Sequence, residues 1–305
     1  MSFSAINLAE LPHPEIIAQI PHASLVAQRK MRLVEIIAEY DPALAAGVDA
    51  ALALESDLTV KLFEEDAERE VHLRQAVQDA GAGNLLAFAS GAVLDHLAAY
   101  WGIARQVVQE ADPDASPAVP EVLESDDRLR RRVQLAPEAI TTCGSKGSYE
   151  FWGLAASPEV KDVEVTSPAE GEVHVTVLST LGNGTPSQEL LAAVFATIDP
   201  RRDFCARFSV GGAVINHYSV IAELTLLDGP DAELVRQTSL VALEAHVAER
   251  HQLRRDITLS GLYGALWGAG IHDVKLLSPT ADIVVESGHA PFCTSITLTV
   301  AGRNE

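Results

Sequence analysis

The sequence predicts an α+β protein with an N-terminal helical region followed by two related α+β units, in which antiparallel hairpins pack on helices. Helical spacing of apolar residues dominates before residue 110, and strand-like alternation begins near Val160. The run VKDVEVTSP at 160–168 returns as IHDVKLLSP at 271–279, with an apolar residue, Asp, Val and Ser-Pro at the same spacing. This separation is not a solenoid period, so the repeat indicates two similar units, unless two strands ending in turns resemble each other by chance. With 305 residues, 48% of them hydrophobic, the chain can bury a large core.

The first predicted helix lies in the run LVAQRKMRLVEIIAEYDP at 25–42, where Asp41-Pro42 ends it. Its apolar side chains recur at helical spacing: Val26, Leu33, Ile36, Ile37 and Tyr40. This stripe could pack on its own domain or on helices of another subunit, and the sequence leaves both possibilities open.

Two further helical stretches complete the region 1–110. One runs over 56–80, where two Glu/Arg pairs stand at i,i+4, and the Gly-rich run 81–84 ends it. The other, 85–101, is almost wholly apolar but carries Asp95 and His96, so we expect it in a helical core or at an interface rather than in a membrane. His96 has no second ligand at metal spacing and is best interpreted as a polar residue at the core edge.

The segment 111–124 is rich in Pro, Ala and acidic residues and lacks periodicity, so we predict a semi-rigid linker. The first α+β unit, 125–212, then begins with Ser125 as N-cap of a helix that carries Leu129, Val133 and Leu135 and ends before Pro137. Its basic run 128–132 is expected to form a solvated or ion-paired helix face.

We expect Ser148 to cap the next helix, before a hairpin of strands near 160–165 and 173–178. Gly182-Asn183-Gly184 lacks the Gly-Lys-Ser/Thr ending of a phosphate loop and is interpreted as a tight turn. Thr185 is the expected N-cap of a helix that runs to Ile198.

The second α+β unit, 213–305, is expected to hold a strand at 214–227, a long helix at 231–252, and a short helix capped by Ser260. The second copy of the Asp-Val-Ser-Pro strand and a final strand at 294–300 close the predicted fold, which is typical of the α+β class.

Composition excludes several functions. The net charge of -21 argues against nucleic acid and anionic membranes as partners. The N-terminus shows no signal-peptide pattern and no run is long enough to span a bilayer, so we expect assembly in the cytoplasm. Cys143, Cys205 and Cys293 lie far apart without a CxxC or Cys/His cluster, so no zinc site is implied.

A catalytic constellation is not evident, and we predict no catalytic, cofactor or metal site. Asp162 and Asp273 could be offered as twin carboxylates, but neighbouring strand residues point to opposite faces, so His272 would not converge with Asp273. A strand-end hydrogen bond is the favoured role for these Asp residues. The alternative function is an α+β enzyme or ligand-binding protein with a site assembled from Asp162, His174 and Asp273.

Four runs together resemble one known family, the baseplate assembly protein J family of contractile phage tails and phage-tail-like bacteriocins. They are LLAFASGAVLDHLAAYWGIAR at 85–105, ESDDRLRRRVQLAPEAITT at 124–142, YEFWGLAASPEVKDVEVTSPAEGEVHVTVLS at 149–179 and DITLSGLYGALWGAGIHDVKLLSP at 256–279. The resemblance extends from about Ala50 to the end. The sequence departs at Lys146 and Trp152, where smaller residues are expected, and at Arg254-Arg255, where a Gly is usual.

This resemblance implies a non-enzymatic wedge subunit of a baseplate, which links the hub to the sheath and transmits the contraction trigger. It implies a smaller partner of the protein I family, with two J copies to one I, and contacts with neighbouring J subunits, the sheath initiator and hub proteins. The N-terminal helices would join the partner bundle, for which we predict Leu33, Ile36, Ile37 and Tyr40, and the second α+β unit would contact the next wedge. A component of a related secretion or injection apparatus is the alternative within the structural class.

Overall fold

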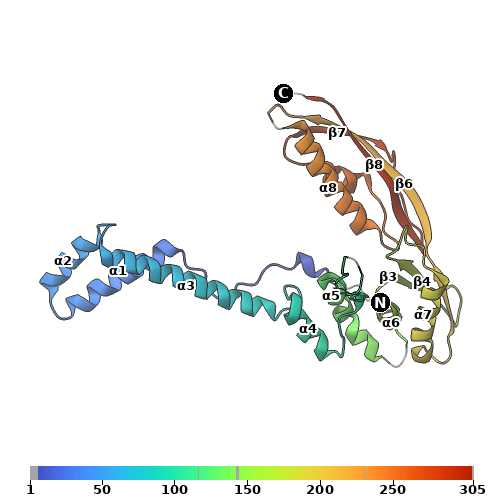
Figure 1. The fold of residues 1–305 in the computed structure, drawn as a ribbon, viewed down its shortest axis with the longest axis horizontal. Helices are drawn as coiled ribbons and strands as arrows, with labels where there is room; N and C mark the ends of the chain where they lie inside the picture. Colours follow the sequence, from blue (N-terminus) through green and yellow to red (C-terminus); the bar gives the residue numbers. More distant parts are fainter. Residues whose placement is uncertain (1–5, 116, 142–143, 230, 304–305) are drawn as a thin grey trace. The chain divides into compact units, whose positions relative to one another are not determined.

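The computed structural model describes residues 6–115, 117–141, 144–229 and 231–303, and the chain divides into two compact units. One unit spans Ile6–Gly102 and is helical, whereas the other begins at Ile103 and contains two three-stranded sheets with helices (Figure 1). The predicted α+β class is therefore confirmed.

The N-terminal unit contains one helix that the sequence did not reveal. Its elements are the 3-10 helix η1 (Leu8–Glu10) and the helices α1 (His22–Ala38), α2 (Pro42–Leu52), α3 (Leu58–Gly83) and α4 (Gly91–Tyr100). Asp41 caps α2, because its Oδ1 accepts hydrogen bonds from the N–H groups of Ala43 at 2.9 Å and Leu44 at 3.1 Å. Pro42 then occupies the first helical position, where no N–H is needed. The pair that ends α1 thus also begins α2.

Polar side chains tie α1 to its two neighbours. Arg29 of α1 forms an ion pair of 3.0 Å with Glu70 of α3, and Arg74 completes this cluster at 2.8 Å from the same carboxylate. The Lys30 ammonium donates to the carbonyl of Leu52 at 2.8 Å, which closes the end of α2. Glu70 and Arg74 are one of the two Glu/Arg pairs predicted at i,i+4 in this helix, and this ion pair is confirmed.

The Gly-rich run 81–84 does not break α3 where expected, because the helix continues to Gly83. Gly81 instead gives space to an extended segment: an added Cβ there would lie 2.5 Å from Cδ1 of Ile16. Buried Gln78 holds this segment, accepting from the Ile16 N–H at 2.9 Å and donating to the Pro14 carbonyl at 2.5 Å.

The segment expected as a linker belongs to a narrow antiparallel ribbon. Strand β1 (Val107–Gln109) pairs with β2 (Val122–Leu123), and Asp112 bridges to Val119 between them. All strand residues of this ribbon are exposed on both faces, so its sequence lacks the alternation of apolar and polar residues that marks a half-buried strand.

The first α+β unit places a mixed sheet against helices. In chain order it contains α5 (Asp126–Leu135), η2 (Ala136–Ile140), α6 (Lys146–Ala156), β3 (Val160–Thr166), β4 (Glu172–Ser179), α7 (Gln188–Ile198), η3 (Asp199–Arg201) and β5 (Arg207–Gly212). β3 and β4 form the expected antiparallel hairpin, and β5 pairs in parallel with β4.

Three helix caps test the sequence expectations in this unit. Ser125 caps α5 as predicted, accepting from the Arg128 N–H at 3.4 Å. The cap of α6 is Ser145 rather than Ser148, and the cap of α7 is Ser187 rather than Thr185. Ser145 lies three residues before the predicted cap and accepts from the Ser148 N–H at 3.2 Å, and Ser187 lies two residues after the predicted Thr185 and accepts from the Leu190 N–H at 3.1 Å.

The second α+β unit has a longer sheet with the order β7-β6-β8. Its elements are β6 (Val214–Leu226), α8 (Ala232–Arg250), α9 (Leu259–Leu266), β7 (Ile271–Ser278) and β8 (His289–Arg303). Thr258, not the expected Ser260, caps α9. Both helices bury their apolar side chains with alternate residues of β6, including Val220 and Leu224 at 0% exposure. Figure 1 shows α8 lying along this sheet.

The two repeat strands occupy matching places. β3 follows α6 and β7 follows α9, and each forms the antiparallel edge of its sheet, beside a central strand that also has a parallel neighbour. The order along the chain differs, because the central strand follows β3 but precedes β7. The expected hairpin is therefore present only in the first sheet. β5 continues through Ala213 into β6, so one length of chain belongs to both sheets.

Candidate functional site

The structure does not bring the candidate catalytic residues together. Asp162 is buried in β3, Asp273 is exposed in β7, and His174 lies in β4 with its Nδ1 2.8 Å from the Ser209 hydroxyl. Asp273 pairs in register with Thr225, in the other sheet from Asp162. The three residues therefore do not form one site.

Asp162 joins the two α+β units. Its Oδ2 accepts a hydrogen bond of 3.0 Å from the Leu253 N–H in the loop after α8, 91 residues away in sequence. Its Oδ1 accepts from the Arg131 guanidinium at 2.5 Å and from the Val163 N–H at 3.0 Å. The expected structural hydrogen bond is thus present, and it connects distant parts of the chain.

Glu164 forms a second connection from the same strand, and sequence reasoning missed it. Its carboxylate accepts from the Ser287 hydroxyl and from the Gly288 N–H, both at 2.7 Å. Arg254 lies 3.5 Å from it. Asp162 and Glu164 are two residues apart and so share a strand face, which is the sequence signal that could have identified the pair. We call these two carboxylates the β3 clasp.

A small apolar cluster closes the junction beside the β3 clasp. It contains Leu178, Ala213, Leu253 and Ala290, with Ile215 packed against it. A backbone hydrogen bond lies at the same junction, because the Ala213 N–H donates to the Val177 carbonyl at 2.9 Å. Because buried charges are costly unless they are paired, this satisfied junction favours one arrangement of the two sheets.

The basic run of α5 is used inside the fold. The Glu124 carboxylate, fully buried, pairs with Arg132 and, at 3.2 Å, with Arg128. Arg128 also donates to the carbonyls of Leu154 and Ser157. Burial lowers the pKa of Arg128, while Glu124 opposes this shift. The predicted ion pairing is confirmed, but these guanidinium groups are largely buried rather than solvated.

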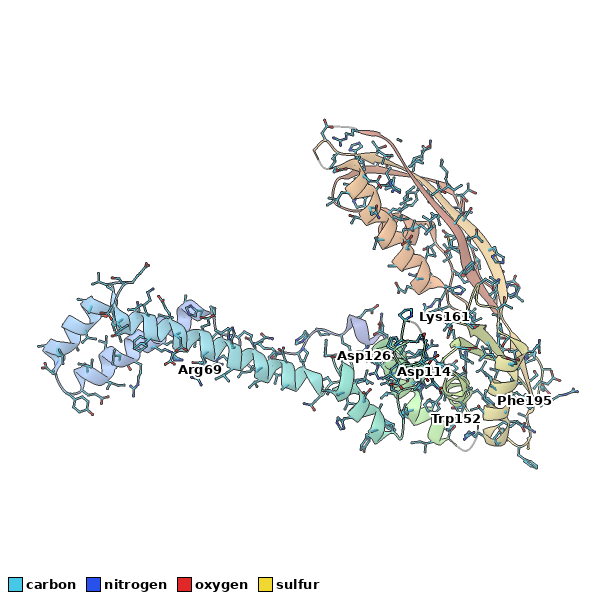
Figure 2. All side chains as sticks on the ribbon, in the orientation of Figure 1. Arg69, Asp114, Asp126, Trp152, Lys161 and Phe195 are labelled. Atoms are coloured by element: carbon cyan, nitrogen blue, oxygen red, sulfur yellow. The ribbon has the colours of Figure 1, made fainter. Side chains whose placement is uncertain are left out.

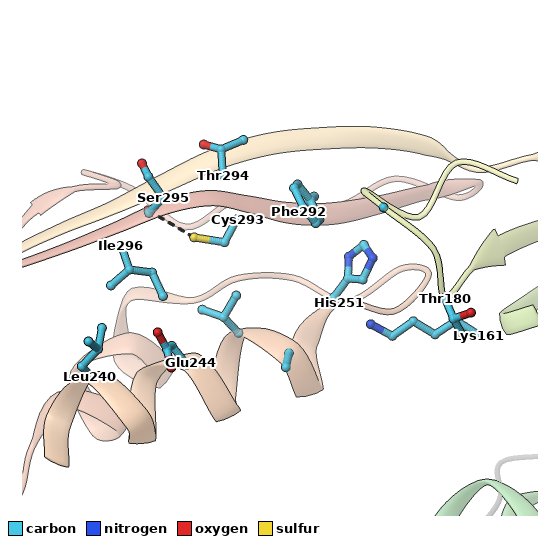
Figure 3. Close-up of a pocket in the computed structure, with 13 residues that line it drawn as sticks. Lys161, Thr180, Leu240, Glu244, His251, Phe292, Cys293, Thr294, Ser295 and Ile296 are labelled. Atoms are coloured by element: carbon cyan, nitrogen blue, oxygen red, sulfur yellow. Dashed lines mark hydrogen bonds between the residues drawn. The ribbon is translucent and has the colours of Figure 1, made fainter. Parts of the chain in front are cut away.

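A pocket of about 510 Å³ lies between α8 and β8 (Figure 3). Its lining mixes apolar and polar residues from both elements: Leu240, Glu244, Val247, Ala248, His251, Phe292, Cys293, Thr294, Ser295 and Ile296, with Lys161, Thr180 and Gly182 from the first α+β unit. The close-up shows Lys161 near His251 at one end and Glu244 towards the other.

Burial changes the titration of several groups at this pocket. It lowers the pKa of His251, which hydrogen-bonds through Nδ1 to the Pro291 carbonyl at 2.6 Å, a contact that partly offsets the shift. It also lowers the pKa of Lys161 and raises the pKa of the Cys293 thiol. Burial therefore favours the protonated thiol and the neutral imidazole at this pocket.

The helices of the N-terminal unit expose many large apolar side chains. Tyr40 is 83% exposed and Leu58 76%, and others follow along the helices: Met31, Ile36, Leu44, Leu62, Leu73, Val77 and Tyr100. Figure 2 shows side chains projecting along α3, Arg69 among them. Of the predicted stripe, Ile36 and Tyr40 are exposed, whereas Leu33 and Ile37 are half-buried. Such surface is typical of an interaction site.

The described residues contain no group of three or more His, Cys, Asp or Glu that could hold a metal ion. None of the described helices is long and apolar enough to cross a membrane. Cys143, one of the three cysteines, lies outside the described residues.

Three family models match successive parts of the chain. They are the Baseplate J-like N-terminal domain at residues 55–112, the central domain at 141–212 and the C-terminal domain at 218–299. Baseplate protein J of Escherichia phage P2 is 37% identical over 302 residues, which is 98% of this chain and 99% of that protein. The chain belongs to the Baseplate J-like family.

The Baseplate J-like family consists of structural phage proteins, so the chain is a structural baseplate component and the alternative of an α+β enzyme is wrong. A solved chain from the anti-feeding prophage (AFP) baseplate aligns with a TM-score of 0.41 and 12% identity, over 61% of this chain and 47% of that one. Asp162 and His174 take part in the structural contacts described above.

Proposed function

We propose that this chain is a wedge subunit of a contractile baseplate, which links the hub to the sheath and transmits the contraction trigger. The observation that carries the proposal is the 37% identity to the phage P2 protein over nearly the whole length of both chains. The β3 clasp supports a mechanical role, because it couples the two sheets through buried, paired carboxylates.

The proposed partners follow from the same relationship. A smaller protein of the I family binds the N-terminal region, 1–110, with two J copies to one I, and the second α+β unit, 213–305, contacts the neighbouring wedge. Sheath initiator and hub proteins are the further proposed partners. Assembly takes place in the bacterial cytoplasm, and the particle is a phage tail or a phage-tail-like bacteriocin.

The exposed apolar side chains of the N-terminal unit support a shared helical bundle. We assign Leu33, Ile36, Ile37 and Tyr40 to this interface. Ile36 and Tyr40 are the better positions for a test, since their exposure means that changes there leave the packing of α1 on its own unit intact. Substitutions at half-buried Ile37 would disturb both packing and binding.

The deciding experiment is coexpression with the neighbouring tail genes, followed by mass measurement of the purified complex. We expect a heterotrimer, and we expect Ile36→Asp combined with Tyr40→Asp to abolish it. Gln28→Ala, at an exposed polar position of α1, is the matched control and retains the complex. A monomer under all conditions, or an intact complex with the double variant, would contradict the proposed interface.

A further inference from the structure

The pocket between α8 and β8 lies beside an open sheet edge. β8 is an outer strand of its sheet, and only β6 pairs with it among the described strands. Its first part is covered: the His289 carbonyl accepts from the Arg254 N–H at 3.1 Å, and the Pro291 carbonyl contacts His251. The Ser295 carbonyl accepts from the Cys293 thiol of its own strand at 3.4 Å. From Ile296 to Gly302, no backbone hydrogen bond from outside the sheet reaches β8 in the described part of the chain. An uncovered edge of this length is a template for another strand.

A bulge marks the point where the edge opens. Tyr218 pairs with Cys293 and the next residue, Ser219, pairs with Ser295, so Thr294 is extra. The Thr294 hydroxyl donates to the Tyr218 carbonyl at 3.0 Å, which holds the bulge. Bulges bend an edge strand and re-aim its side chains, and here the bulge lines the pocket.

Two charges in the pocket lack ion-pair partners among the described residues. The Lys161 ammonium is half-buried and interacts electrostatically with Asp162, but both oxygens of that carboxylate already accept hydrogen bonds from other groups. Glu244 lies towards the other end. Glu244 lies two turns before the end of α8, whereas His251 follows its last residue and interacts electrostatically with Lys161, so the two charges lie at opposite ends of the pocket.

We propose that this pocket and the open edge of β8 bind an extended segment of another tail protein. The segment adds a strand beside β8, sets an acidic side chain against Lys161 and a basic one against Glu244, and places apolar side chains on Val247 and Ile296. Main-chain pairing supplies affinity, and the acidic–apolar–basic order supplies specificity.

The test uses an array of overlapping peptides from the tail proteins encoded beside this gene, together with peptides from this chain, probed with the full-length protein. We expect bound peptides to share the acidic–apolar–basic order, and Lys161→Glu to weaken binding about tenfold. Replacing the acidic residue of a bound peptide with Lys should restore binding to that variant. Lys275→Glu, on β7 at the opposite edge of the sheet that contains β8, is the control and binds normally.

Three results would overturn the proposal. They are an array without any bound peptide, equal binding by the two Lys variants, and capture only of peptides from this chain, which would make a second copy the occupant. This proposal rests on the proposed function only in the choice of tail proteins from which the peptides are taken. Because the heterotrimer assay probes Ile36 and Tyr40 in the other unit, its outcome is distinguishable from this one.

Discussion

Removing the Glu164 carboxylate from the β3 clasp should destabilise the protein by about 3 kcal/mol. Glu164→Ala deletes two hydrogen bonds of 2.7 Å, to the Ser287 hydroxyl and the Gly288 N–H, and leaves those donors without an acceptor. A bond to a charged group contributes about 1.5–3 kcal/mol, and the lost desolvation cost of the buried carboxylate offsets part of the sum. The ion pair with Arg254 adds little, because its guanidinium is 58% exposed.

Urea unfolding followed by tryptophan fluorescence measures this loss. The matched control is Glu223→Ala, which removes an exposed pair with Lys275 on the second sheet and should cost no more than about 1 kcal/mol. Hydrogen exchange should also accelerate at the Gly288 amide. A loss below about 1 kcal/mol, or equal losses for the two variants, would refute the view that buried carboxylates hold the sheets together.

Further predictions concern the same junction. Gly184 has φ +98°, and a Cβ added there would lie 2.6 Å from a Leu178 methyl group, so Gly184→Ala should cost about 3 kcal/mol of stability. Gly182 has φ +59° but nothing within 4 Å of an added Cβ, so Gly182→Ala should cost about 1 kcal/mol. Equal shifts of the melting temperature for the two variants would contradict this. Arg254 has φ +56°, a left-handed conformation that glycine adopts more easily than alanine, so Arg254→Gly should be about 1 kcal/mol more stable than Arg254→Ala. If chemical denaturation ranks the two variants the other way, the backbone at Arg254 is not strained. Burial lowers the pKa of His251 below its ordinary 6.5, so the unfolded chain binds a proton that the folded chain does not. Stability should therefore fall as the pH drops below about 6.5, and less steeply in His251→Gln, as unfolding titrations at pH 7 and pH 5 can show.

Local signals in the sequence predicted much of the fold. The Ser125 cap, the burial of Leu129 and Val133, and the hairpin of β3 and β4 depend on neighbouring residues and on strand or helix periodicity. Helix α2 was missed because Asp41-Pro42 is both a stop and a start signal. The ribbon of β1 and β2 was missed because an exposed strand pair needs no alternation.

The candidate sites were less accessible to sequence reasoning. The sequence indicated that Asp162 has a structural role, but not that its acceptor oxygen meets the Leu253 amide 91 residues later. Likewise, the basic run 128–132 predicts ion pairs, but the burial of Arg132 against Glu124 depends on which face of α5 packs inward. The pocket at α8 and β8 combines residues from three separate segments, and periodicity carries no information about such convergence.

By itself, then, the sequence determined the class of the fold and most helices and strands, because these depend on local spacing, and the resemblance of four of its runs indicated the family. Only the tertiary structure decided that β5 continues into β6, that Asp162 and Glu164 clasp the second unit, and that Lys161 faces a pocket. The physical reason is that buried charges take their roles from partners brought close by folding, and those partners lie far away along the chain.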